Sequence, residues 1–269
     1  MGWREPYRDE AWESAEPFEP QRADKIAAAY LDARRRNQDF QETAVRLDAE
    51  SLLPAGELGK LWQQNFQAAA KRIDGALLQS PKLPPFAYEI PFDGQTLQGS
   101  LGNLYQCGQV FYLDRKPNAP QRIALLLEHL IFCAVESQTT ETRQTHIVKP
   151  EETTLYPEIS GSQAQEMLQK WLTFFNLGQT RPLPFFAKTS LAAAEAYGKK
   201  QSWEDALNKA RESYHGNKVS KGQKDYTEVA LVFGNEDIEP VEGALFQRLV
   251  EELLIPLLDA VKEESSDAA

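Results

Sequence analysis

The feature that most constrains the fold is a change in hydrophobic period between residues 81 and 86. Before this point, apolar residues recur every three or four positions, as on one face of a helix. After it, short runs of aromatic and branched residues are separated by turn signals, which is the pattern of strands. Pro81, Pro84 and Pro85 stand at the change, where proline interrupts regular structure. We therefore predict an N-terminal helical region followed by an α/β core.

The helical region is expected over residues 21–80, after an irregular lead-in at 1–20. One helix is predicted over 21–47 and a second over 57–79, with a break at Pro54 and Gly56 between them. Their apolar stripes consist of Ile26, Tyr30, Ala33, Phe40, Ala44 and Leu47 on the first helix, and Leu58, Leu61, Trp62, Phe66, Ala69, Ile73 and Leu77 on the second.

The core is expected over residues 81–262, followed by an acidic tail at 263–269. Three antiparallel strands are predicted at 86–92, 96–105 and 110–115. The Asp93-Gly94 pair favours a hairpin turn in which both central residues have positive φ. A buried helix is expected at 119–135, and further helices at 163–175, 189–198, 203–214 and 241–262. Capping is assigned to Ser162 with Gln165 and to Ser202, a kink is assigned to Pro256, and 226–233 fits either a strand or a helix.

Charge and cysteine usage limit the classes of protein. The net charge is −11, and most of it lies at the ends: six acids oppose two arginines in 1–20, and six oppose one lysine in 251–269. We therefore expect weak DNA binding by this chain alone. Two cysteines outside any C-x-x-C pair fit a reducing cytoplasm. No run approaches the roughly 20 apolar residues of a membrane span, so a soluble cytoplasmic protein without membrane contact is expected.

The side chains that most often carry chemistry give no site in this sequence. His129, His146 and His215 share no metal-ligand spacing, and the phosphate-binding Gly-x-x-x-x-Gly-Lys-Ser/Thr pattern is absent. We interpret His129 as a hydrogen-bonded core histidine, and Cys107 and Cys133 as structural residues. No cofactor and no metal are expected.

One basic segment is a candidate surface for DNA phosphates or for a partner protein. An ordinary solvated loop is the alternative interpretation. Its seven basic residues are Lys199, Lys200, Lys209, Arg211, Lys218, Lys221 and Lys224.

The predicted order of helix, three-stranded meander and buried helix resembles the core of the restriction-endonuclease-like, PD-(D/E)XK nuclease fold, with a small mixed sheet flanked by helices. Working members hold a divalent cation with an aspartate on the second strand and an Asp/Glu-x-Lys motif on the third. Here Asp114 and Lys116 form such a motif, but Gly102 stands at the second-strand position. We therefore interpret Gly102, Asp114 and Lys116 as vestigial and expect no catalytic residue. The alternative is an active metal-dependent DNA nuclease using Asp114, Lys116 and either Asp93 or Glu89.

Four segments resemble the C-terminal domain of RecC, the gamma subunit of exodeoxyribonuclease V, in order and in spacing. They are Leu53–Gly59 with Trp62, Leu127–Ala134, Pro182–Ser190, and Tyr214–Asn217 with Gly222. The resemblance implies a non-catalytic scaffold and DNA-handling domain of the RecBCD helicase–nuclease, acting in double-strand-break repair by homologous recombination. The implied partners are the RecB and RecD subunits, and DNA through the complex. A RecB-like or AddB-like nuclease domain is disfavoured, because the aspartate and the iron–sulfur cysteines are missing.

Overall fold

A computed structural model describes residues 20–72, 78–113, 115–135, 140–216, 221–234 and 239–262, with side chains from residue 25 onward. Residues 1–19 of the predicted lead-in at 1–20, and the predicted acidic tail at 263–269, lie outside the described residues, and residue 20 begins the first described helix. The chain divides into two compact units. The first comprises 1–80 with 111–116 and 147–154, and the second comprises 81–110, 117–146 and 155–269.

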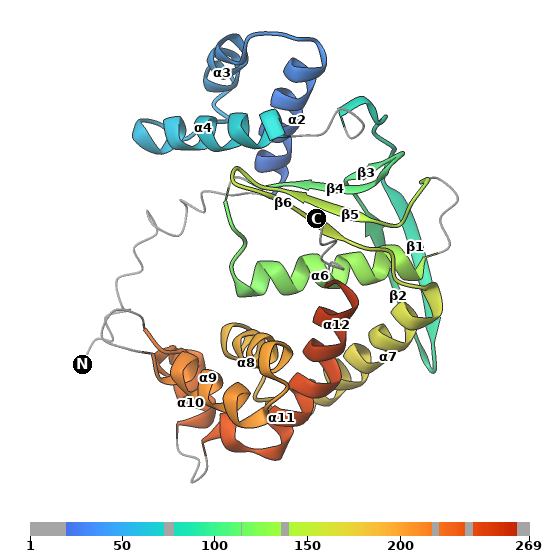
Figure 1. Ribbon diagram of the computed structural model, residues 1–269, viewed down its shortest axis with the longest axis vertical. Helices are drawn as coiled ribbons and strands as arrows, with labels where there is room; N and C mark the ends of the chain where they lie inside the picture. The colour runs from blue at the N-terminus through green and yellow to red at the C-terminus, as the bar shows by residue number, and fades with distance from the viewer. Residues whose placement is uncertain are drawn as a thin grey trace, which may run out of the picture. The chain divides into compact units, whose positions relative to one another are not determined.

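Three helices form the described N-terminal part of the first unit (Figure 1). They are α2 (Pro20–Arg35), α3 (Phe40–Ala49) and α4 (Glu57–Arg72), and both α3 and α4 pack against α2. Their shared core includes Ile26, Tyr30, Leu47, Trp62 and Phe66, all of which are almost fully buried. Burial of these large apolar side chains stabilises the three-helix arrangement.

The single helix predicted over 21–47 is wrong, because a turn at residues 36–39 separates α2 from α3. The backbone amide of Gln38 donates to Ala33 O and that of Asn37 donates to Arg34 O, with Asn37 at a positive φ of 52°. These two bonds define a Schellman motif, in which a left-handed residue ends the helix. Asp39 then caps α3 by accepting from the Gln41 amide at 2.9 Å. Asparagine and aspartate two residues apart therefore stop one helix and start the next.

The strands form two sheets instead of one meander. A two-stranded hairpin joins β1 (Phe86–Phe92) to β2 (Gln95–Leu101), and a four-stranded sheet has the order β3-β4-β5-β6. Its strands are β3 (Leu104–Tyr105), β4 (Gly108–Tyr112), β5 (Thr145–Val148) and β6 (Thr153–Tyr156). The predicted strand at 96–105 is broken at Gly102-Asn103, where Asn103 has a φ of 53°. The sequence did not predict β5 or β6.

The four-stranded sheet is mixed. β3 pairs with β4 antiparallel. Along β4 and β5, the Gln109 amide donates to Gln144 O and the Leu113 amide donates to Val148 O. Both partners advance by four residues in the same direction, so β4 and β5 run parallel. The α6 helix (Ala119–Ala134) connects them, as a parallel pair requires. The α/β class with a small mixed sheet and flanking helices is therefore confirmed.

The hairpin turn between β1 and β2 differs in detail from the prediction. The strands pair through Phe92 and Gln95, which leaves Asp93 and Gly94 as the two loop residues. Only Gly94 has a positive φ, at 77°. The prediction that both loop residues adopt positive φ is wrong, and the conformational freedom of glycine alone makes this turn.

Helices cover α6 on the side away from the sheet (Figure 1). α7 packs directly on α6, and α8 packs on α6, α9 and the C-terminal helices. The segments are α7 (Gly161–Gly178), α8 (Ala187–Lys200), α9 (Trp203–His215), η1 (Gln223–Asp225), α10 (Thr227–Phe233), η2 (Pro240–Glu242), α11 (Ala244–Leu249), η3 (Val250–Leu254) and α12 (Ile255–Ala260). Among the residues that the structure describes, no helix combines the length and the apolarity needed to cross a bilayer.

Three details of these helices depart from the sequence predictions or resolve them. Ser160, not Ser162, caps α7 by accepting from the Gln163 amide. Residues 227–233 are helical, which settles the ambiguous segment. The closing helix is interrupted by the π-helical turn η3 just before Pro256. Proline has no amide proton to continue an α-helical ladder, and a π turn accommodates the change.

Candidate functional site

Gly102 lies between β2 and β3, beside a buried polar network in the second unit. Its carbonyl accepts from the Gln109 side-chain amide at 3.2 Å, and the same amide donates to Glu128 Oε1 at 3.1 Å. Gln109, on β4, is fully buried. A Cβ added at Gly102 would have no heavy atom within 4 Å, so packing does not exclude a side chain here. Gly102, the predicted vestigial position, therefore contributes only its backbone carbonyl to this network.

The network continues from Gln109 to α6. The Thr145 hydroxyl lies 3.3 Å from Gln109 Oε1 and 2.8 Å from His129 Nδ1. His129 Nε2 lies 2.9 Å from the Pro157 carbonyl, which can only accept, so Nε2 carries the proton. Thr145 and His129 are both fully buried. The prediction that His129 is a hydrogen-bonded core histidine is confirmed.

Burial controls the protonation of the groups around this network. It lowers the pKa of His129 from 6.5 to about 4, although the hydrogen bond to Pro157 opposes the shift. Burial likewise raises the pKa of the Cys133 thiol to about 11. Cys133 lies one helical turn beyond His129, with its sulfur 3.6 Å from His129 Nε2. At neutral pH the imidazole is neutral and the thiol is protonated, which suits structural roles.

The assignment of Gly102, Asp114 and Lys116 as vestigial nuclease positions stays a prediction. Asp114 lies outside the described residues. Lys116 belongs to the first unit and Gly102 to the second. In the first unit, Lys149 is the main cause that lowers the pKa of Glu152, and the charge of Lys116 is a minor one. Within the described ranges, no group of three or more His, Cys, Asp or Glu side chains is placed to hold a metal ion.

Most of the basic candidate residues already have partners within the chain. Lys200 pairs with Asp205 at 2.6 Å, Lys209 with Glu212 at 2.5 Å, and Arg211 with Glu242 at 2.9 Å. Lys221 lies 5.2 Å from the centre of the Tyr226 ring. Lys199 is on α8, and Lys218 lies outside the described residues. A phosphate would have to compete with these carboxylates, although exposed pairs of this kind are weak.

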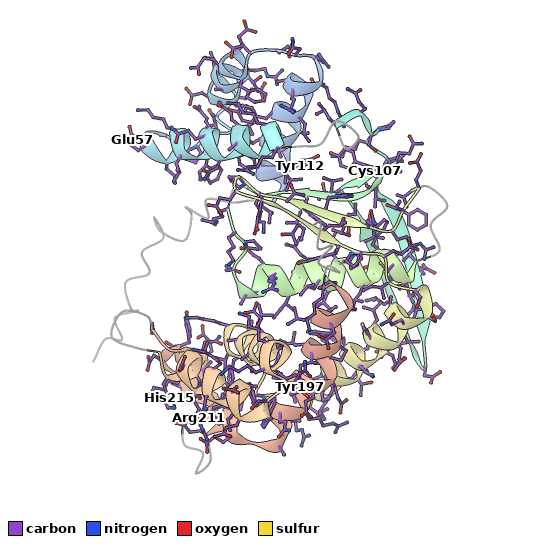
Figure 2. The ribbon with its side chains drawn as sticks, viewed as in Figure 1. Glu57, Cys107, Tyr112, Tyr197, Arg211 and His215 are labelled. Carbon is purple, nitrogen blue, oxygen red and sulfur yellow. The ribbon has the colours of Figure 1, made fainter. Side chains whose placement is uncertain are left out.

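A polar cluster surrounds the end of α9, where Arg211 and His215 lie one turn apart (Figure 2). His215 Nε2 is 2.8 Å from Glu239 Oε2, and Lys224 Nζ is 2.9 Å from His215 Nδ1. Lysine can only donate, so His215 accepts at Nδ1 and donates from Nε2 to the carboxylate. The basic segment is therefore held by hydrogen bonds to the neighbouring η1 and η2 region.

Large apolar side chains are exposed on α10 and just before it. Leu231 is 78% exposed, Val232 47% and Tyr226 45%. Leu231 and Val232 are neighbours in the sequence, and exposed apolar residues that lie together can mark a contact surface for another protein. We name Tyr226, Leu231 and Val232 the α10 surface. The sequence fitted either a strand or a helix over 226–233, so it did not predict which of these side chains would be exposed.

Comparison with protein families identifies the chain. A family model described as "RecC C-terminal domain" matches residues 1–198. The chain belongs to the RecC C-terminal domain family. The match includes the three helices described in the first unit, both described sheets, α6 and α7, and ends within α8. A search of curated proteins gave no match.

Family membership confirms the resemblance that the sequence segments indicated. Three of those segments lie inside the matched range: Leu53–Gly59 with Trp62, Leu127–Ala134 and Pro182–Ser190. The second of them contains His129 and Cys133. The histidine and the cysteine of the Leu-Glu-His-Leu-x-x-Cys-Ala pattern therefore lie in or beside the buried network. Sequence reasoning missed Gln109 and Thr145, because each lies in a short strand whose polar residue resembles a solvent-facing position.

Proposed function

We propose that this chain is a non-catalytic scaffold and DNA-handling domain of the RecBCD helicase–nuclease. Its work would be double-strand-break repair by homologous recombination, through contacts with the RecB and RecD subunits and with the separated DNA strands. The observation that carries the proposal is Gly102, whose carbonyl is held by Gln109 inside a buried network. A restriction-endonuclease-like core with that position occupied by backbone alone lacks one of the two carboxylates that such nucleases use.

Two surface properties support a role inside a complex. The chain is strongly acidic overall, and the partners of Lys200, Lys209 and Arg211 are its own carboxylates. Free duplex DNA would therefore gain few phosphate contacts from the basic segment. The α10 surface, in contrast, offers apolar area that a partner protein could cover.

Co-expression with the RecB and RecD subunits, followed by affinity capture, tests the proposal. Replacing Leu231 and Val232 with lysine should reduce the captured partner at least tenfold, because charge enters an apolar contact. Glu228→Lys is the matched control, since Glu228 is exposed on the same helix and this variant changes the net charge by the same amount as the double variant. Undiminished capture by the double variant would exclude the α10 surface. Capture of neither subunit by the unchanged chain would overturn the proposed function.

A further inference from the structure

A polar cavity of about 350 Å³ opens within the first unit. It lies between the end of α2, the start of α3 and the second half of α4, and its lining includes Arg34, Gln38, Asp39, Phe40, Gln67 and Lys71. The volume lies within the range of small-molecule sites, at the small end. The lining combines cations, amides, one carboxylate and one aromatic ring, which is a different composition from the apolar core beneath it.

The walls of this cavity are fixed by the local structure. The Schellman motif at Asn37 and the Asp39 cap set the path of the turn between α2 and α3. The Phe40 ring meets the fully buried Tyr30 ring edge-on, with centroids 5.5 Å apart and planes at 83°. The aromatic wall is therefore oriented before any ligand arrives, which lowers the entropic cost of binding.

The helical segment that lines the cavity differs in charge from the whole chain, and the charged lining residues are Arg34, Asp39 and Lys71. Residues 20–72 carry nine lysines and arginines against seven acids, whereas the whole chain has a net charge of −11. Lys71 Nζ lies 5.9 Å from the centre of the Phe40 ring, a cation–π contact. On the same helix, Lys60 is paired with Glu57 at 2.7 Å. A ligand that brings an anion and a flat ring could use both the ammonium of Lys71 and the face of Phe40.

We propose that this cavity binds one nucleotide unit, with its base against Phe40 and its phosphate toward Arg34 and Lys71. The amides of Gln38 and Gln67 can both donate to and accept from a base edge, and Asp39 can accept from an exocyclic amino group. Inorganic phosphate would leave Phe40 unused and would meet the like charge of Asp39. Base–aromatic stacking tolerates any base, so the site selects a nucleotide without reading its identity. The proposal goes beyond the proposed function, because binding at this cavity requires no partner subunit.

Two binding measurements on the full chain test the site and distinguish a strand from a free nucleotide. One uses fluorescence anisotropy with a labelled single-stranded DNA of about ten nucleotides, and the other uses calorimetric titration with dAMP. Phe40→Leu and Lys71→Gln should each weaken binding about fivefold or more, while Lys60→Gln should leave it within about twofold. If the two variants weaken binding of the single-stranded DNA, the cavity binds one unit of a strand. If they weaken binding of dAMP, the cavity binds a free nucleotide.

Three results would overturn the proposal: no binding in either arm, equal losses for Lys60→Gln and Lys71→Gln, or displacement of the probe by inorganic phosphate as effective as displacement by dAMP. Lys71 is exposed, so Lys71→Gln decides the question even if Phe40→Leu lowers the melting temperature. Affinity capture of RecB with the Lys71→Gln chain separates the two proposals. If the Lys71→Gln chain still captures RecB but no longer binds nucleotide, the cavity acts independently of the assembly. If it loses RecB but still binds nucleotide, Lys71 serves the assembly and the nucleotide proposal fails.

Discussion

The buried imidazole of His129 couples the stability of the fold to pH. Burial lowers its pKa from 6.5 to about 4, so the unfolded chain binds a proton more readily than the folded chain between these values. Well above pH 6.5, His129 is neutral in both states and does not change the free energy of unfolding. As pH falls from 6.5 toward 4, the unfolded chain takes up the proton first, and the folded state loses stability. A shift of this size corresponds to about 3 kcal/mol. We expect urea unfolding of the full chain to show that loss between pH 7 and pH 4.

A His129→Gln chain provides the control, because glutamine can still donate to the Pro157 carbonyl but does not titrate. Other acidic groups contribute to acid unfolding in both chains, so the difference between the two pH profiles measures His129. Parallel profiles would contradict the assignment. The hydroxyl of Thr145 has one proton, which serves either His129 Nδ1 or Gln109 Oε1. Protonation of the imidazole at Nδ1 would therefore redirect that proton to Gln109.

At the scale of elements, the turn between α2 and α3 tests whether Asn37 is chosen for its conformation. Its φ of 52° lies in the left-handed region, where glycine is unstrained and a β-branched residue is strongly disfavoured. Asn37→Gly should stabilise the chain by about 0.5 kcal/mol, and Asn37→Val should destabilise it by about 1–2 kcal/mol. Chemical unfolding followed by circular dichroism measures both. Equal stabilities for the two variants would show that the turn does not depend on this residue.

The same turn shows why part of the fold could not be predicted from sequence. Apolar spacing continues in phase from Tyr30 through Phe40 to Leu47, so periodicity alone indicates one helix. The break depends on two polar residues, Asn37 and Asp39, whose hydrogen bonds to the backbone act locally. Long periodic elements such as α6 were predicted nearly to the residue. The four-residue strands β5 and β6 are too short to show a period and form by pairing with the rest of the sheet.

At the scale of the whole molecule, the candidate sites are defined by partners distant in the sequence. His129 could be assigned to the core because its helix is apolar on most sides, but its partners Thr145 and Pro157 lie 16 and 28 residues away. The basic segment was recognised as a run of cations, yet Arg211 pairs with Glu242, 31 residues further on. The cavity at Phe40 joins α3 to residues of α4 and had no signature in the sequence. Periodicity predicts which elements exist, whereas these pairings are set by the packing of the elements.

The interpretation of Gly102 as a vestigial nuclease position predicts how the whole chain responds to metal and DNA. Asp114 would be a lone carboxylate at the nuclease position, and hard cations such as Mg²⁺ need several oxygen ligands. We expect titration with Mg²⁺ or Mn²⁺ to show no saturable binding that depends on Asp114, and a linear-DNA cleavage assay to show no product. Asp114→Ala is the test variant, and Asp48→Ala, exposed on α3, is the matched control. Cleavage that Asp114→Ala abolishes and Asp48→Ala leaves intact would show a working nuclease, in which an acid other than one at position 102, such as Asp93 or Glu89, completes the site.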